Sequence, residues 1–575
     1  MSSNLKRHVN SNSNKNLKKI KDAQKTWEKN HYDKLEMELK EEFKSEEDIL
    51  IKRLYTPLDL EEKGFDYLEC LGFPGDFPFT RGITPKMYRG KLWSMSQYSG
   101  YGTPEESNEL WRAQIEAGST GIAIAYDLPT QIGYDPDHLM SEGEVGRIGI
   151  SMVSLRDWEV AFEKIDLDKV QVAQIMNALG GAAIAMHLVL AEKRGNSWKK
   201  LQGSCQNDVL KEYVARGTHI FPPIPSIRFT SDTLAFCAQH VPEYNPITVC
   251  SLHFSERGAN RVHEAAFAIA DAIAYVEGAV SRGIDVDKIG PGIIWLTSHE
   301  HFAFFHEIAK IRAMRRIWAN LMRNRFKAKD PRSMMMRIRS SESGSSLTKE
   351  QYLNNIGRIA IAALAGVLAG IQLLDLRCYD EQYGIPTKEA QITNIRLQQI
   401  VAHETQVAET IDPLAGSYYV ETLTAELEER IWEELEKIDN IGGAVRAIEQ
   451  GYFQKCMSDD AYQYQLAFQV GEVKRVGVNC FRSEMEDQRP TKVYRTDPKV
   501  EEKRKKDVVE LRKNRDNSLV ERCLKDLKDV AREETTAENN VMPAIIETVK
   551  AYGTMGEMAE VLREVWGEYK EATFI

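Results

Sequence analysis

Segments with strand-like and helix-like patterns alternate about eight times between Tyr98 and Thr393. The predicted strands are Gly121–Tyr126, Val170–Met176, Leu201–Cys205, Ile247–His253, Gly292–Leu296, Met334–Arg339 and Gly370–Leu374, with a weaker one at Ile148–Val153. The clearest helical patterns are Glu106–Glu116, Gly258–Ser281, His301–Arg325 and Lys349–Leu368. Repeated alternation of this length predicts an α/β fold, a (β/α)8 TIM barrel. A doubly wound sheet is the alternative, although no GxGxxG fingerprint follows an early strand.

The sequence on either side of this region differs in composition. Residues 1–54 form a charged arm, with an exposed helix expected within 28–48, and residues 55–97 form a loop-rich segment expected to wrap over a domain surface. We expect the barrel to occupy residues 98–393 and a helical extension of it to occupy 394–491. Residues 492–575 read as a charged linker followed by C-terminal helices.

Charge and cysteine content narrow the function classes. A net charge of -11 over 575 residues argues against nucleic acid as the main partner, because phosphate binding needs a basic face. The eight cysteines include no CxxC pair, so their spacing indicates neither a zinc site nor a disulfide framework, and a reducing cytoplasm fits best. The apolar run Ile359–Leu374 is too short and too interrupted by glycine for a membrane span.

The segment Ser204–Arg228 combines polar, cationic and apolar residues in one connection. Its first half predicts a short helix that faces the core, and Pro222 and Pro223 predict an extended loop after it. Polar residues also stand at the predicted carboxyl ends of strands, where barrel enzymes place their chemistry. They are Asp127, Asn177, Gln206, Asn207, His253, Arg339 and Asp375. A structural role is the plainer interpretation of any one of them, but seven together favour a site.

Walker-type phosphate loops, HExxH, GxSxG and kinase motifs are absent from the sequence. Long stretches instead resemble the large, substrate-binding subunit of adenosylcobalamin-dependent acyl-CoA mutases, the methylmalonyl-CoA mutase family. The matching stretches are FPFTRGITPKMYRGKLWSMSQYSGYGT, AYDLPTQIGYDPDH, QNDVLKEYVARGTHIFPPIPSIR, DPRSMMMR and ETIDPLAGSYYVE. The resemblance covers roughly Tyr55 to Phe481, and more loosely the C-terminal tail.

The resemblance implies a barrel that holds an acyl-CoA along its axis, where a filled core is usual. Small or polar inward residues would suit this arrangement, and the candidates are Ala123, Ser204, Gln206 and Ser251. It also implies radical chemistry: an adenosyl radical takes a hydrogen atom from the substrate, the carbon skeleton rearranges, and the hydrogen returns.

Roles for individual residues follow from the same resemblance. Tyr98 matches the tyrosine beside the substrate, and Arg216 matches the arginine that binds the free carboxylate of a dicarboxylic acyl group. His253 matches the histidine that hydrogen-bonds the thioester carbonyl, and Gln206 matches a polar neighbour of substrate and adenosyl group. Glu381 matches the acid that binds the adenosyl ribose. Further expected substrate contacts are Met87 and Lys91, and further expected cofactor contacts are Ala125, Asn177 and Arg377.

The cobalt-ligating DxHxxG motif of the family's cofactor domain does not occur in this sequence, where Asp137 and His138 are adjacent. The resemblance therefore implies that a separate small subunit supplies the cobalamin-binding domain. We expect a hetero-oligomer, and a large subunit that alone does not hold cobalamin tightly.

Several positions depart from the family pattern. Apolar or small residues replace polar ones at Ala123, Leu252, Gly292, Ile294 and Leu373, and other polar residues are exchanged at Lys91, Arg339, Ser341 and Arg377. We count Leu252, Ile294, Arg339 and Leu373 among the substrate-binding candidates. The default substrate is methylmalonyl-CoA or succinyl-CoA. The changes leave open a bulkier alkyl- or aryl-substituted succinyl-CoA or an alkylmalonyl-CoA, and also a non-catalytic paralogue that serves as an interaction subunit.

Overall fold

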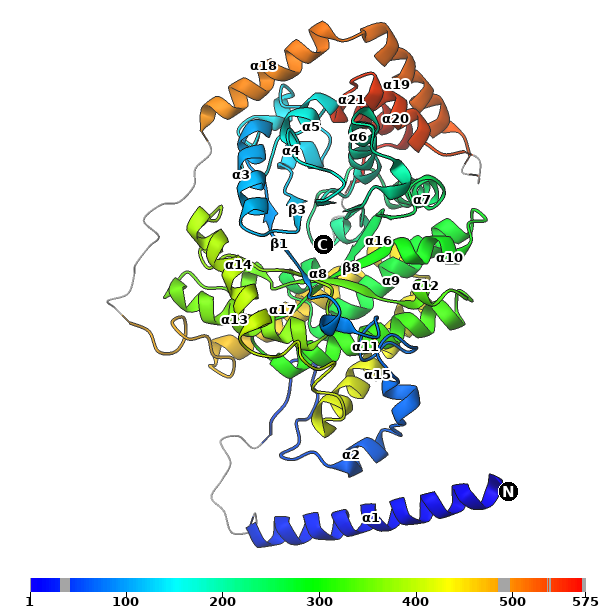
Figure 1. The fold of residues 1–575 in the computed structure, drawn as a ribbon, viewed down its shortest axis with the longest axis vertical. Coiled ribbons are helices and arrows are strands. Elements are labelled where there is room, and N and C mark those ends of the chain that lie inside the picture. The colour runs from blue at the N-terminus through cyan, green and yellow to red at the C-terminus, as the bar shows by residue number, and fades with distance from the viewer. Residues whose placement is uncertain (1, 32–41, 484–496, 535, 537–538, 571–575) are drawn as a thin grey trace.

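The computed structural model describes residues 2–31, 42–483, 497–534, 536 and 539–570 (Figure 1). Its first helix, α1 (Ser2–His31), lies at one end of the molecule near α2 (Pro57–Glu62). Of the helix expected within 28–48, residues 28–31 belong to α1, residues 32–41 lie outside the described residues, and residues 42–48 are not helical.

Short parallel strands form the centre of the molecule. They are β1 (Ser94–Ser96), β2 (Tyr98–Ser99), β3 (Gly121–Ile124), β4 (Gln171–Gln174), β5 (Gly203–Cys205), β6 (Tyr244–Asn245), β7 (Ile247–Cys250), β8 (Ile293–Ser298), β9 (Arg337–Ser341) and β10 (Leu373–Asp375). One sheet has the order β2-β3-β4-β5-β6 and the other β1-β10-β9-β8-β7. Every strand pair in both sheets is parallel.

The two sheets are joined at two places into one ring. Only Gln97 separates β1 from β2, and only Pro246 separates β6 from β7. Each of these pairs is therefore one strand that changes its partner at a single residue. Proline cannot donate to a strand ladder, which accounts for the break at Pro246. Read around the ring, the eight resulting strands have the order of a (β/α)8 barrel, as the sequence predicted.

Helices surround the ring in chain order. The longer ones are α3 (Pro104–Glu116), α5 (Leu155–Ala161), α6 (Gly180–Lys193), α7 (Pro223–His240), α9 (Arg261–Val280), α11 (Phe304–Asn324), α13 (Asn355–Leu368) and α14 (Lys388–His403). Local sequence sets their starts: at α3, Thr103 accepts the N–H of Glu106 while Pro104 occupies the first turn, where its missing N–H costs nothing.

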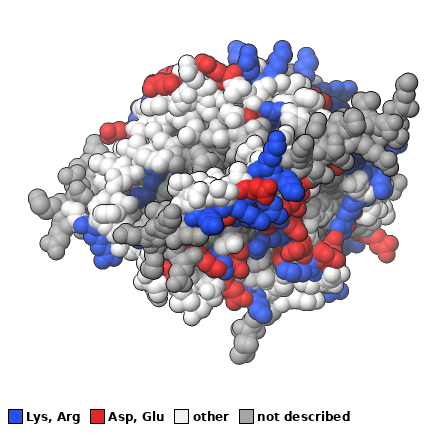
Figure 2. Space-filling view, turned by 90° about the horizontal axis from the view of Figure 1, so that it is seen from below, with Lys and Arg blue, Asp and Glu red and all other residues white. Residues whose placement is uncertain are grey.

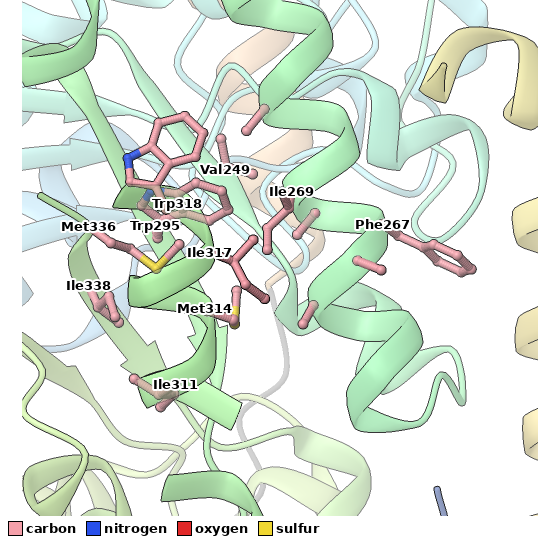
Figure 3. Packing of buried hydrophobic residues seen from close by; sticks show 14 of the residues in the cluster. Val249, Phe267, Ile269, Trp295, Ile311, Met314, Ile317, Trp318, Met336 and Ile338 are labelled. Atoms are coloured by element: carbon pink, nitrogen blue, oxygen red, sulfur yellow. The ribbon is translucent and has the colours of Figure 1, made fainter. Parts of the chain in front are cut away.

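The core lies between strands and helices (Figure 3). Val249, Trp295 and Ile338 come from neighbouring strands and belong to one buried cluster with residues of α9 and α11. The rings of Trp295 and Trp318 meet edge to face with centroids 5.0 Å apart, an arrangement that adds to their burial. This packing fixes the strand ends on which the site is built.

A helical layer follows the barrel in sequence. It consists of α15 (Tyr418–Ile441), α16 (Ala444–Glu449) and α17 (Tyr452–Gln469), in the region where long helices were predicted. The central helix α15 packs along α9 and α11. Its buried residues, including Leu427 and Ile431, extend the barrel core outward.

The charged segment expected as a linker with exposed helix is helical and largely exposed over its described residues, which begin at 497, but it also packs on the barrel. It contains α18 (Pro498–Asn514) and α19 (Asn517–Arg532), followed by the expected helical pair α20 (Met542–Lys550) and α21 (Met555–Trp566). These helices arch over α5, α6 and α7 (Figure 1). The buried guanidinium of Arg504 pairs with Asp157 at 2.7 Å, and Arg512 pairs with Asp135 at 2.6 Å. The charges of this segment therefore anchor it to the barrel.

Three other expectations are corrected. Ile148–Val153 is not a strand: Ile150 makes only isolated bridges, to Gly102 and Tyr126. The first barrel strand begins earlier than expected, at Ser94. Pro222 and Pro223 do not hold an extended loop, because Pro223 is the first residue of α7, a position that its fixed φ favours.

The remaining elements are single turns or little more. The short α-helices are α4 (Leu128–Gln131), α8 (Leu252–Glu256), α10 (Val286–Ile289) and α12 (Pro331–Met334). A π turn spans Tyr67–Leu71, and 3-10 turns span Met87–Arg89, Leu139–Ser141, Trp198–Lys200, Leu210–Tyr213, Gly290–Gly292, Gly344–Ser346, Tyr352–Asn354 and Glu381–Tyr383. On the face seen in Figure 2, cationic and anionic side chains are interspersed. Among the described helices, none has the length and apolar character needed to cross a membrane.

Candidate active site

A cavity of about 410 Å³ occupies the barrel axis. Short side chains and glycine line it from the strands, among them Gly121, Ala173 and Ser204. Of the expected substrate contacts, it brings together Met87, Lys91, Ile294, Arg339 and Leu373. The small inward residue Ser204 is placed as predicted, whereas the buried Ser251 hydroxyl faces away and donates to Glu264 at 2.6 Å.

Arg216 stands in the connection between β5 and α7, at the carboxyl end of the strands. Its Nη1 lies 3.8 Å from Glu212 Oε1, beyond hydrogen-bond distance. This buried nitrogen has no hydrogen-bond partner in the part of the chain that the structure describes. Burial lowers the pKa of Arg216, but Glu212 and then Tyr98 outweigh it and raise the pKa. The guanidinium therefore stays charged with an unused donor.

A buried polar network holds the segment that carries Arg216. Lys211 and Glu212 are fully buried and form an ion pair. The Glu212 carboxylate also accepts from Asn177 Nδ2 at 2.6 Å and from the Thr218 hydroxyl at 2.7 Å. With all its acceptors engaged, Glu212 fixes the position from which Arg216 extends.

The C-terminal residues pack against the outer side of the segment that carries Arg216. The Tyr569 N–H donates to the Ile220 carbonyl at 2.9 Å, and its ring packs edge to face against Tyr213 and His219. Trp566 of α21 packs against Phe221 with ring centroids 5.1 Å apart. Residues more than 300 positions apart in sequence thus build one support for Arg216.

His253, on α8, carries a neutral imidazole. Burial, and then the positive charges of Lys211, Arg216 and Arg377, hold the pKa of His253 well below its usual value of 6.5. The Cys250 sulfur lies 3.5 Å from His253 Nδ1, and burial raises the pKa of Cys250 to about 12. The thiol therefore keeps its proton and can donate it to Nδ1. This leaves the hydrogen on Nε2, which suits a donor to a carbonyl oxygen.

Tyr98 belongs to β2, beside a second ion pair. Its backbone N–H donates to Asp375 Oδ1 at 3.2 Å, and Asp375 Oδ2 lies 2.5 Å from Arg339 Nη2. The Arg339 Nε is buried and unpartnered among the described residues. The pair joins the ends of β2, β9 and β10 and places a guanidinium on the cavity wall.

Gln206 and Asn177 are joined at the ends of β4 and β5. Asn177 Nδ2 donates to Gln206 Oε1 at 3.0 Å. The Gln206 amide nitrogen, buried as well, has no acceptor within the described part of the chain. The Asn177 side chain is hydrogen-bonded to its neighbours, whereas the side-chain N–H of Gln206 is available to a ligand.

Arg377 lies among acidic side chains above β10. Its Nη1 is 3.7 Å from Glu381 and its Nη2 is 3.5 Å from Glu256, while its backbone N–H donates to Glu342 at 2.5 Å. Burial raises the pKa of Glu381, and Arg377 partly opposes that rise. Ala125, by contrast, is buried directly after β3 and its carbonyl accepts the Ile150 N–H.

The apolar side chains that replace polar ones in the family pattern do not all lie together. Ile294 and Leu373 line the axial cavity, in the company of Lys91. Leu252 is separate: it packs with Cys250 and Leu296 in a small buried cluster at the carboxyl ends of β7 and β8. Because Leu252 precedes His253 in the chain, it lies with the polar residues at the carboxyl ends of the strands.

Sequence reasoning missed the supporting residues of this site. Lys211 and Cys250 are buried partners of Glu212 and His253, and Tyr569 lies far along the chain. For Lys211 a signal existed, because a cation inside a short core-facing helix requires a counter-charge. For Tyr569 none existed in the local pattern.

Comparison with known proteins gives one consistent result. The family model described as methylmalonyl-CoA mutase matches residues 44–568. A 2-hydroxyisobutanoyl-CoA mutase large subunit from Aquincola tertiaricarbonis is 40% identical over 96% of this chain and 97% of its own length. A methylmalonyl-CoA mutase from Rhizobium meliloti is 37% identical over 91% of this chain and 72% of its own length. The mitochondrial methylmalonyl-CoA mutase of Homo sapiens is 34% identical, over 91% and 68%.

Proposed function

The chain belongs to the methylmalonyl-CoA mutase family, and from this premise we propose that it is the large subunit of an adenosylcobalamin-dependent isomerase that rearranges a dicarboxylic acyl-CoA. Methylmalonyl-CoA and succinyl-CoA are the default substrate pair. The observation that carries the choice of a dicarboxylic acid is the unused, buried N–H of Arg216.

A second carboxylate on the substrate would complete the environment of Arg216. Guanidinium and carboxylate match as a planar, two-bonded pair, and such charge-assisted bonds are stronger than neutral ones. Glu212 cannot fill this role, because it lies 3.8 Å away and is held by Lys211, Asn177 and Thr218.

The neighbouring groups suit the other end of the acyl chain. We assign the thioester carbonyl to His253 Nε2–H, whose tautomer Cys250 supports. The Tyr98 ring would pack beside the acyl group, and the free amide N–H of Gln206 would donate to substrate or cofactor. Coenzyme A would follow the axial cavity past Ile294 and Leu373, with Lys91, Met87 and Arg339 on its wall.

The residues at the carboxyl mouth fit the ribose of an adenosyl group. A ribose offers hydroxyl donors, and Glu381 presents carboxylate oxygens there, with Arg377 as the adjacent cation. Glu342 adds a buried oxygen that has no hydrogen-bond partner within the described residues and lies 3.8 Å from His299 Nε2. When bound, the cofactor supplies the organic radical that removes a hydrogen atom from the substrate. Ala125 would offer only a methyl surface, and Asn177 would act through Gln206 and Glu212.

A separate cobalamin-binding subunit is part of the proposal. The relative from Aquincola tertiaricarbonis is itself named a large subunit, and it matches this chain over nearly its whole length. We therefore infer a hetero-oligomer in which the small subunit covers the carboxyl ends of the strands.

A second candidate is a bulkier substituted succinyl-CoA or an alkylmalonyl-CoA. Leu252 favours it, because an apolar side chain beside His253 would contact hydrocarbon, and each buried CH2 contributes about 0.8 kcal/mol. Ile294 and Leu373 line the axial cavity, so they would contact coenzyme A and not the acyl group. A hydroxyacyl-CoA, suggested by the name of one relative, would offer the unused N–H of Arg216 a neutral hydroxyl in place of a carboxylate.

Binding of two matched esters tests the role of a second carboxylate. Succinyl-CoA and butyryl-CoA have acyl chains of similar size and differ in whether a carboxylate or a methyl group ends the chain. By calorimetric titration of the full chain, we expect succinyl-CoA to bind at least about 10-fold more tightly, since a buried charge pair is worth more than about 1.4 kcal/mol. Equal affinity, or tighter binding of butyryl-CoA, would contradict the proposal.

The neutral state of His253 predicts a pH profile. Because the pKa of His253 lies well below 6.5, the imidazole should remain unprotonated from about pH 8 to about pH 5.5. The ratio of kcat/KM for the wild type to that for His253→Gln should therefore stay constant over this range. A ratio that changes with a midpoint near 6.5 would show that the imidazole titrates there and that its environment is polar.

A further inference from the structure

Three side chains of different ligand types meet on three helices outside the barrel mouth. His263 comes from α9, Glu434 from α15 and Cys456 from α17. The ring nitrogen, carboxylate oxygen and sulfur that they offer all lie within 4.8 Å of one another. Cysteine spacing could not predict this group, because it contains one cysteine and is assembled from distant parts of the chain.

The orientation of His263 is fixed by a fourth residue. Its Nδ1 lies 2.6 Å from Asp460 Oδ2, and the same carboxylate accepts the backbone N–H of Asn260 at 2.9 Å and the Asn260 side chain at 3.0 Å. The Nε2 lone pair then points toward Glu434, with Oε2 at 3.9 Å. An imidazole held by a carboxylate on one nitrogen and free on the other is the usual arrangement of a metal-ligating histidine.

The net charge of the side chains around these three residues favours a bound cation. Glu434 is buried and accepts from the Tyr452 hydroxyl at 2.7 Å and from Lys437 at 2.9 Å. With a neutral imidazole, Glu434 and Asp460 together carry one more negative charge than Lys437 balances. A divalent ion bound to the Cys456 thiolate would make this cluster neutral.

We propose that His263 Nε2, Glu434 and Cys456 bind a transition-metal ion, best matched by Zn²⁺, with water as the fourth ligand. Nitrogen, sulfur and carboxylate oxygen in a four-coordinate site are the ligands that zinc prefers. On binding, the Cys456 S–H bond breaks, its proton leaves to solvent, and the sulfur electron pair forms the bond to the metal. No oxidation or reduction takes place.

The metal would act as a clamp between α9, α15 and α17. The cap of α9 is part of the same arrangement, because Asp460 binds Asn260. The segment from α8 to this cap carries His253 at its start, so the clamp would fix one side of the barrel mouth from outside. This inference does not depend on which acyl-CoA the chain transforms.

Cobalt substitution tests the site, because Co²⁺ bound to a thiolate gives a strong near-ultraviolet charge-transfer band. Titration of the full chain with Co²⁺ should produce this band at one equivalent, release a proton, and lose the band when Zn²⁺ is added. Cys456→Ser should abolish the band, and Asp460→Asn should weaken Co²⁺ binding by about 10-fold to 100-fold. Cys523→Ser, which alters a half-buried cysteine on α19, is the matched control and should retain the wild-type spectrum.

A thermal measurement covers the case in which a variant folds poorly. Zn²⁺ should raise the melting temperature of the wild type and of Cys523→Ser, and leave that of His263→Gln unchanged. Absence of the band in the wild type, a band that survives in Cys456→Ser, or equal Zn²⁺ stabilisation of His263→Gln would each overturn the proposal.

Discussion

Arg216→Gln is expected to lower kcat/KM for a dicarboxylic acyl-CoA by about 30-fold to several-thousand-fold. Truncating one partner of a buried, hydrogen-bonded charge pair costs about 2–5 kcal/mol, and each 1.36 kcal/mol is a factor of ten in rate. Glutamine keeps a polar end but loses the charge and the paired N–H donors that match a carboxylate. The measurement is steady-state turnover in the presence of the small cobalamin-binding subunit.

Two further variants separate this role from folding. Arg332→Gln removes an exposed arginine that pairs with Asp330 on α12, and it should turn over like the wild type. Arg216→Lys keeps the charge without the planar fork and should fall between wild type and Arg216→Gln. If Arg216→Gln folds normally and matches the wild type on the dicarboxylic ester, the assignment is wrong.

Lys211→Met is expected to destabilise the folded chain by about 3–5 kcal/mol. Lys211 is fully buried against Glu212, and removing one member of a buried pair leaves the other charge uncompensated. Asp208 shares the environment: burial raises the pKa of Asp208 to about 6, and Lys211 acts against that rise. The loss should appear as a lower melting temperature and a lower denaturant midpoint.

The double variant Lys211→Met/Glu212→Gln checks this explanation. It removes both charges, so part of the stability should return, whereas the exposed Lys199→Met should behave like the wild type. A Lys211→Met chain as stable as Lys199→Met would show that the pair contributes nothing to the support of Arg216.

The barrel could be predicted because its strands are buried and apolar. The segment around Ile247, for example, has four buried residues in a row and pairs as expected. The first strand escaped detection since SMSQYS contains no β-branched residue and breaks at Gln97. Ile148–Val153 has the right composition, yet a strand needs a neighbour, and only Ile150 finds one.

The sequence could propose residues that contact the substrate, but it could not predict the residues that support them. Motif resemblance marked Arg216, His253 and Gln206 in sequence, and the structure adds Cys250 behind the histidine and Tyr569 behind the arginine loop. Such partners are set by packing between distant segments, which leaves no local pattern. The contact that holds α18 on the barrel is also between distant segments, since Arg504 is buried against Asp157. The local sequence of α18 therefore resembled a linker.

Turnover by the reconstituted enzyme tests most directly whether the chain is a mutase subunit for a dicarboxylic acyl-CoA. The full chain, a small subunit that carries the DxHxxG motif, and adenosylcobalamin would be incubated with succinyl-CoA, a branched succinyl-CoA and 2-hydroxyisobutanoyl-CoA in competition. We expect the complex to isomerise a dicarboxylic ester, to leave the hydroxyacyl ester unchanged, and to show no turnover without the small subunit. A complex that forms but isomerises none of these esters, or that isomerises only the hydroxyacyl ester, would contradict this expectation.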